Sequence, residues 1–108
     1  MKIADDIIAA AKAFNLKITC AESCTGGMVC SALTDVPGSS EVFERGYVVY
    51  SNQAKIQMLQ VSEISLRTHG AVSEPVVLEM AIGAKEDAMA DIAIAVSGIA
   101  GQIGRAHV

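Results

Sequence analysis

The chain has 108 residues, which is enough for one domain with a single hydrophobic core. Hydrophobic residues make up 52% of it and charged residues 19%, a balance that excludes an intrinsically disordered chain. The formal net charge is -4 and the Lys and Arg residues are scattered, so the sequence lacks the basic stripe with which proteins displace counterions from DNA or RNA. We therefore expect no nucleic-acid partner.

The N-terminal segment predicts an amphipathic helix carrying Asp5 and Asp6 rather than a signal peptide, and no apolar run approaches the length of a membrane span. We therefore expect a cytoplasmic protein without membrane contact. The three cysteines, Cys20, Cys24 and Cys30, are odd in number and closely spaced, which favours reduced thiols over a disulfide framework. They include no Cys-x-x-Cys pair, so their spacing predicts no metal site.

The first half of the sequence predicts two helices and one strand. Apolar residues recur at helical spacing over residues 3–14, and Asn15 is expected to end that helix. A buried strand is predicted at residues 17–21 and a short helix at residues 26–33. The turn-forming segment 35–40, Asp-Val-Pro-Gly-Ser-Ser, ends this helix.

The second half continues the alternation of helix and strand. Residues 46–50 are β-branched and aromatic, which predicts a strand; Asn52 is expected to cap the next helix and Ser62 a shorter one. The longest helix is predicted to begin at residues 73–75, Ser-Glu-Pro, and the last strand covers residues 91–96. Strands separated by helices predict an α/β fold with three layers (α/β/α) around a mainly parallel sheet.

Two loops rich in small residues follow predicted strands. Residues 19–27, TCAESCTGG, lead from the first strand into a helix, and residues 97–101, SGIAG, follow the last strand. Glycines allow close approach to the backbone, and free N–H groups at the start of a helix bind phosphates or oxyanions. Neither loop has the third glycine or the acidic residue of a dinucleotide-binding motif. If the strands are parallel, both loops lie at one edge of the sheet and form a candidate site.

Each side chain near this site also has a structural interpretation. Ser23 and Thr25 are typical helix N-caps. Glu22 suits either acid–base chemistry or a carboxylate held by the helix dipole. Cys24 suits either a nucleophile or a small core residue, and Lys55 either a functional amine or a solvated surface lysine.

Five motifs in a fixed order resemble the CinA C-terminal domain family, especially its stand-alone bacterial members, the nicotinamide-nucleotide amidohydrolases. The resemblance extends over residues 18–101. The motifs are residues 19–27, residues 35–40, the Tyr-Ser-Asn-x-x-Lys pattern at 50–55, the His-Gly-Ala-Val-Ser segment at 69–73, and residues 97–101.

The resemblance implies hydrolysis of the carboxamide of nicotinamide mononucleotide, which gives nicotinate mononucleotide and ammonia in pyridine-nucleotide salvage. It implies no metal or cofactor, a small-molecule nucleotide substrate and a homodimer. The matching positions are Ser23 as nucleophile and Lys55 as base, with Tyr50 assisting. The substrate-binding residues expected from the two loops are Glu22, Cys24, Thr25, Gly26, Gly27, Ser97 and Gly98.

These roles set a requirement for the electrostatics of the site. A lysine can accept the Ser23 proton only when its amine is neutral, so the pKa of Lys55 must fall below its usual value of about 10.4. Partial burial or a neighbouring cation would lower it. The Tyr50 hydroxyl is expected to relay the proton or to hold Lys55 in place. Backbone N–H groups of residues 24–27 are expected to stabilise an oxyanion or to hold the ribose phosphate.

The resemblance ends after Gly101. Family members continue into a Pro- and Gly-rich loop, further strands, a basic site residue and a closing helix, and residues 102–108 match none of these. One codon reading of the heptapeptide, CAG ATC GGA AGA GCA CAC GTC, looks like a sequencing-library adapter. We therefore expect residues 1–101 to be a partial family domain with its C-terminal part missing, residues 102–108 to be a non-native tail, and this chain to be inactive.

Two further functional hypotheses remain beside the amidohydrolase. One is a non-catalytic nucleotide-binding or regulatory domain of the same fold. The other is an enzyme with Cys24 as nucleophile, which iodoacetamide would inhibit.

Overall fold

The computed structural model describes residues 2–98 and the backbone of residues 106–107. Among the described helices, none is long and apolar enough to cross a membrane. The elements in chain order are α1 (Lys2–Phe14), β1 (Ile18–Glu22), α2 (Met28–Thr34), the 3-10 helix η1 (Ser39–Glu41), β2 (Phe43–Val48), α3 (Asn52–Leu59), α4 (Glu63–His69), α5 (Glu74–Ala88), β3 (Ile92–Gly98) and β4 (Ala106–His107).

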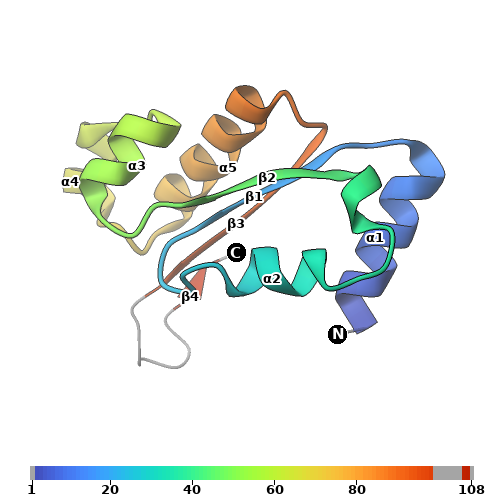
Figure 1. Cartoon of the computed structure of the whole chain (residues 1–108). Helices are drawn as coiled ribbons and strands as arrows, with labels where there is room; N and C mark the ends of the chain where they lie inside the picture. The colour runs from blue at the N-terminus through green and yellow to red at the C-terminus, as the bar shows by residue number, and fades with distance from the viewer. Residues whose placement is uncertain (1, 99–105, 108) are drawn as a thin grey trace.

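The strands form a sheet in the order β2-β1-β3-β4 (Figure 1). The central strand β1 is parallel to both β2 and β3, and Glu22 at its end lies opposite Val48 and Val96. The short β4 is antiparallel to the end of β3. The chain leaves β1 toward β2 on one side and returns to β3 on the other, so the strand order reverses at β1. In open parallel sheets, ligands bind at the carboxyl ends of the strands beside such a reversal.

Helices cover both faces of the sheet, which confirms the three-layer α/β fold. In Figure 1, α1 and α2 lie on one side of the strands and α3, α4 and α5 on the other. Alternate residues of β1 serve the two layers, as the twofold period of a strand requires: Ile18 and Cys20 pack with α1 and α2, and Ala21 packs with α5. The main core partners are Ile8 and Leu33 on the first side and Leu59, Val76 and Met80 on the second.

Several boundaries differ from the sequence prediction. The helix predicted to start at Gly26 begins at Met28, because Gly26 and Gly27 have φ angles of 59° and 113°, in the left-handed region that a helix cannot include. The second strand ends at Val48, so Tyr50 lies beyond it. The buried face of α1 consists of Ala4, Ile8 and Ala11, whereas Ile3 and Phe14, expected on that face, are exposed.

The helix caps are partly as expected. Ser62 caps α4 by accepting a hydrogen bond from the Ser65 N–H. The cap of α3 is Ser51 rather than Asn52, since the Ser51 hydroxyl accepts a hydrogen bond from the Ala54 N–H at 3.0 Å. This cap fixes the start of the helix that carries Lys55.

A close backbone contact holds α3 against α5. The α5 residue Gly83 lies against the last residue of α3, and a Cβ at this position would collide with the carbonyl oxygen of Leu59. A side chain there would push α3 outward and move Lys55 with it. The absence of a side chain at Gly83 therefore helps to set the position of the candidate base.

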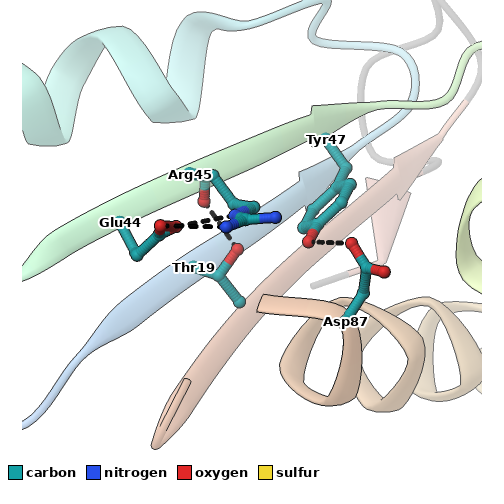
Figure 2. Close-up of polar contacts among 5 residues, drawn as sticks. All are labelled: Thr19, Glu44, Arg45, Tyr47 and Asp87. Atoms are coloured by element: carbon teal, nitrogen blue, oxygen red, sulfur yellow. Dashed lines mark hydrogen bonds and ion pairs between the residues drawn. The ribbon is translucent and has the colours of Figure 1, made fainter. Parts of the chain in front are cut away.

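Side-chain hydrogen bonds tie the outer strand β2 to its neighbours (Figure 2). The Thr19 hydroxyl on β1 donates to the Arg45 carbonyl at 2.6 Å, and the Tyr47 hydroxyl donates to Asp87 of α5 at 2.6 Å. Arg45 also pairs with the adjacent Glu44. Burial and the hydrogen bond to Asp87 raise the pKa of Tyr47 to about 12, so its hydroxyl keeps its proton and the bond at neutral pH.

Candidate active site

A cavity of about 230 Å³ lies at the carboxyl ends of β1 and β3, beside the reversal of strand order. Four other hollows among the described residues are larger, at about 510, 480, 340 and 300 Å³, and none of them is lined by Ser23 or Lys55. The smaller cavity brings together five of the side chains or glycines expected from the sequence with three others. Its lining residues are Ser23, Cys24, Tyr50, Asn52, Lys55, Ala71, Val72 and Gly98.

Ser23 is the first residue after β1 and is anchored by the strands on either side. Its N–H donates to the Val96 carbonyl of β3 at 3.1 Å, and the preceding carbonyl, that of Glu22, accepts from the Val49 N–H at 2.8 Å. The residue is 5% exposed, and its hydroxyl makes no hydrogen bond to any residue between 2 and 98. The hydroxyl at the cavity wall is therefore available to a ligand.

Lys55 is 2% exposed although it carries an amine. Its Nζ donates to the Tyr50 carbonyl oxygen at 3.1 Å, and no carboxylate in the described part of the chain lies within ion-pair distance of it. Burial lowers the pKa of Lys55, because the charged amine loses its hydration, and a negative charge on Cys24 acts in the opposite direction. The direction matches the requirement set by the sequence for a lysine acting as base.

Tyr50 contacts Lys55 in a way the sequence did not predict. Its backbone carbonyl, and not its hydroxyl, holds the amine. The side chain is 66% exposed beside the cavity. A direct role of the Tyr50 hydroxyl in proton transfer stays a prediction.

Glu22 lies outside the cavity, in a group of hydrogen bonds that we call the α2 cap: its carboxylate with the Thr25 hydroxyl and the N–H groups of Gly27, Val29 and Cys30. The four donors lie 2.5 to 3.1 Å from the carboxylate oxygens. Glu22 is fully buried. Burial raises its pKa, but the hydrogen bonds from Cys30, Thr25 and Val29 outweigh burial and lower the pKa to about 2. The geometry matches a charged carboxylate held by the start of α2.

The α2 cap changes which backbone donors are free for a ligand. The Gly27 N–H donates to Glu22, and the Gly26 N–H donates to the Ser23 carbonyl at 3.3 Å. Within residues 2–98, the N–H groups of Cys24 and Thr25 have no such acceptor. The backbone donors of the loop that remain free for an oxyanion are therefore the N–H groups of Cys24 and Thr25. Gly26 and Gly27 contribute to the loop by adopting the left-handed conformations that its turn requires.

Gly98 lines the cavity, and the preceding Ser97 is not among its lining residues. The Ser97 side chain is 1% exposed, and its hydroxyl donates to the Ala71 carbonyl at 2.8 Å. This bond joins β3 to the segment before α5, so Ser97 positions a wall of the cavity while Gly98 lines it. The rest of the expected loop, residues 99–101, and residues 102–105 and 108 of the expected tail lie outside the described residues.

Residues of two sequence motifs line the cavity without having been assigned a role. Asn52 belongs to the Tyr-Ser-Asn-x-x-Lys pattern, and Ala71 and Val72 belong to the His-Gly-Ala-Val-Ser segment. The spacing within the first pattern was informative: Asn52 and Lys55 lie three residues apart on one helix and therefore on one face. The position of Ala71 and Val72 depends on tertiary packing, which the sequence does not reveal.

Cys20, Glu22 and Cys30 place one potential metal ligand each within 4.8 Å of the others. The Glu22 carboxylate is already occupied by the donors of the α2 cap. The two remaining thiols are fewer than the three or four protein ligands of a zinc site. The donor set does not fit a resident metal ion.

The fold and the cavity define an α/β protein with a serine and a buried lysine at the switch point of a parallel sheet. The family model of the CinA C-terminal domain matches residues 1–107. The chain belongs to the CinA C-terminal domain family.

Curated relatives and solved structures agree with this assignment. The chain is 56% identical over 104 residues to the nicotinamide-nucleotide amidohydrolase PncC of Escherichia coli K12, covering 96% of the chain and 63% of that protein. It is 58% identical over 90 residues to a CinA-like protein of Akkermansia muciniphila, covering 83% of the chain and 22% of that protein. The crystal structure of the competence/damage inducible protein CihA from Agrobacterium tumefaciens superposes with a TM-score of 0.89 at 47% identity, covering 95% of the chain and 62% of that structure. The chain thus spans about 63% of the length of PncC.

Proposed function

We propose that this chain is the part of a nicotinamide-nucleotide amidohydrolase that carries its nucleophile and base. The substrate would be nicotinamide mononucleotide, and the products nicotinate mononucleotide and ammonia. The similarity to PncC supports the reaction class. The observation that carries the proposal is the buried Lys55 amine, which has a lowered pKa and lines the same cavity as Ser23.

The proposed reaction proceeds through an acyl-enzyme. Ser23 Oγ attacks the carboxamide carbon while the neutral Lys55 amine takes the hydroxyl proton. The N–H groups of Cys24 and Thr25 would stabilise the negative oxygen of the tetrahedral intermediate. The protonated Lys55 then gives its proton to the departing nitrogen, and the C–N bond breaks to release ammonia. A water molecule, deprotonated by Lys55, hydrolyses the Ser23 ester to give the carboxylate product.

The size of the cavity supports binding of the carboxamide end of the substrate. Its volume of about 230 Å³ is below the range of about 300–1,000 Å³ typical of pockets that enclose a whole small-molecule ligand. A pyridine ring with its carboxamide fits such a space, and the ribose phosphate would then extend beyond it. We also propose a cytoplasmic homodimer, which light scattering and cell fractionation would test.

The test is ammonia release from nicotinamide mononucleotide. It should be run on this chain and on a chimera in which E. coli PncC supplies the part of the domain that follows residue 98. We expect Ser23→Ala to abolish the chimera's activity and Cys24→Ala to retain much of it. Ser31→Ala is a matched control, since it removes an exposed hydroxyl from α2 outside the cavity. Equal loss in Ser23→Ala and Cys24→Ala, or loss confined to Cys24→Ala, would contradict the serine mechanism.

A second candidate function is nucleotide binding without catalysis. The chain is also 58% identical to a protein named CinA-like, and this similarity is compatible with either function. Calorimetric binding of nicotinamide mononucleotide by a chimera that releases no ammonia would support it. Ammonia release by the chimera but not by the chain would instead identify the chain as an inactive fragment.

A further inference from the structure

The sulfurs of Cys20 and Cys30, which flank the Ser23 loop in the sequence, lie close together. Cys20 Sγ on β1 lies 2.9 Å from Cys30 Sγ on α2, within hydrogen-bond distance, and both residues are free thiols. Cys20 is fully buried and Cys30 is half-buried. The third cysteine, Cys24, lines the cavity instead. The two sulfurs therefore form a defined pair, separate from the candidate catalytic residues.

The surroundings hold this pair in place. Gly46 of β2 is the register partner of Cys20, and a Cβ at Gly46 would collide with Cys30 Sγ. The missing side chain at Gly46 thus leaves the space that the Cys30 sulfur fills. From the other side, the Cys30 N–H donates to Glu22 at 2.8 Å. Different neighbours therefore position the two parts of Cys30: Glu22 holds its backbone N–H, and the space at Gly46 holds its sulfur.

We propose that Cys20 and Cys30 are a redox pair that forms an intramolecular disulfide, closing a covalent ring around the nucleophile loop. Residues 21–29, with Ser23 and Cys24 among them, lie inside this ring. A metal ion is a poorer occupant, because the nearby Glu22 carboxylate is already saturated by hydrogen bonds. The proposal is independent of the function proposed above.

The oxidant that we propose is glutathione disulfide. One cysteine thiolate attacks a glutathione sulfur, forming a mixed disulfide and releasing one glutathione. The second cysteine then attacks the protein sulfur of the mixed disulfide, the mixed S–S bond breaks, and the second glutathione leaves. The two cysteines are oxidised, glutathione disulfide is reduced, and the two thiol protons end on the released glutathione molecules.

The reaction is expected to be slow in the folded chain. The hydrogen bond with Cys20, burial and the neighbouring Glu22 carboxylate all raise the pKa of Cys30, so little thiolate is present at neutral pH. Once formed, the cross-link joins two sulfurs that already lie together, so the positions of β1 and α2 are retained. It restricts the unfolded chain, which raises Tm on the order of 10 °C.

The test uses the 108-residue chain with Cys24→Ser, so that two thiols remain. The chain is incubated with glutathione disulfide in the folded state and also refolded from denaturant in a glutathione redox buffer, which removes any limit from slow access. Free thiols are then blocked with N-ethylmaleimide. We expect a monomer that has lost two hydrogen atoms, binds no N-ethylmaleimide and yields a linked peptide joining Cys20 and Cys30. Its Tm should fall again after addition of dithiothreitol.

Cys20→Ser and Cys30→Ser, each combined with Cys24→Ser, are the controls. Each should retain one thiol that N-ethylmaleimide or glutathione modifies, with no rise in Tm. Two alkylated thiols after both treatments, glutathione attached to both cysteines, or an intermolecular disulfide would overturn the proposal.

Discussion

Glu22 and Lys55 are two ionisable side chains buried at the same edge of the sheet, and their surroundings are opposite. Glu22 is 0% exposed and its carboxylate accepts four hydrogen bonds in the α2 cap. Lys55 is 2% exposed and its amine donates one hydrogen bond, to the Tyr50 carbonyl. Neither has an ion-pair partner among residues 2–98.

The difference in surroundings favours different charge states in the two groups. The donors around Glu22 favour its charged form, so this acid contributes to the stability of the loop and helix. Burial of Lys55 without a counter-charge favours its neutral form, so this amine is suited to accept a proton at the expense of stability. Burial alone therefore does not separate the two groups; the number of hydrogen bonds that each charged form makes does.

The largest expected effect is on catalysis and concerns Lys55. In the chimera with PncC, we expect Lys55→Ala and Lys55→Arg to lower ammonia release by comparable factors, on the order of 10³-fold. Arginine keeps the charge but cannot lose its proton at a working pH. Steady-state ammonia assays would measure both. Substantial activity in Lys55→Arg would remove lysine as the base.

The next largest effect is on stability and concerns Glu22. Glu22→Gln removes the charge and turns one acceptor toward the Cys30 N–H into a donor, so we expect the free energy of unfolding to fall by about 3 kcal/mol. Denaturant unfolding at neutral pH would measure this loss. The matched control is Glu41→Gln, whose ion pair with Lys12 is exposed and which should change stability little. Similar stabilities for the two variants would contradict the role of the α2 cap.

The pH dependence of stability gives a sharper test of the same carboxylate. The pKa of Glu22 is lowered in the folded chain from 4.5 to about 2. Its contribution is fully present above pH 4.5 and is lost as the pH falls through about 2, because the unfolded chain binds the proton first. The stability gap between the wild type and Glu22→Gln should therefore shrink over this range. A gap that is constant from pH 6 down to about pH 2 would exclude the lowered pKa.

The sequence predicted the fold, and it predicted that the two loops lie at one edge of the sheet, because both depend on strong local patterns. Alternating helical and strand patterns gave the parallel three-layer arrangement, and parallel strands bring the ends of β1 and β3 to one edge. The positions of Ser23 and Gly98 at this edge follow directly from the strand order. Lys55 was predicted as a site residue through the family resemblance, since a lysine in the second turn of a helix is more often exposed.

The finer contacts of the site depend on distances that local patterns do not contain. Glu22 could be interpreted from the sequence as an acid or as a capping group, and the packing of α2 over the end of β1 decided its contacts. The contact of Lys55 with the Tyr50 carbonyl was not predicted either; β2 ends at Val48, two residues earlier than predicted, and Tyr50 lies beyond it. Local patterns fix neither the exact end of a strand nor which atom of Tyr50 meets the Lys55 amine.

The smallest expected effect completes the comparison: removal of the buried amine should cost almost no stability. Lys55→Met keeps the length of the side chain and loses one hydrogen bond, while it also removes the cost of burying an unpaired amine. We expect its free energy of unfolding at neutral pH to lie within about 1 kcal/mol of the wild type, or above it.

The pH dependence of this Lys55→Met comparison should have a definite sign. The folded chain binds the Lys55 proton less readily than the unfolded chain, so wild-type stability should rise relative to Lys55→Met as the pH increases toward about 10.4. Urea unfolding of both chains between neutral and alkaline pH would measure the difference. A loss at neutral pH as large as that of Glu22→Gln would mean that Lys55 is held as a stabilising charge, and the distinction between the two buried groups would fail.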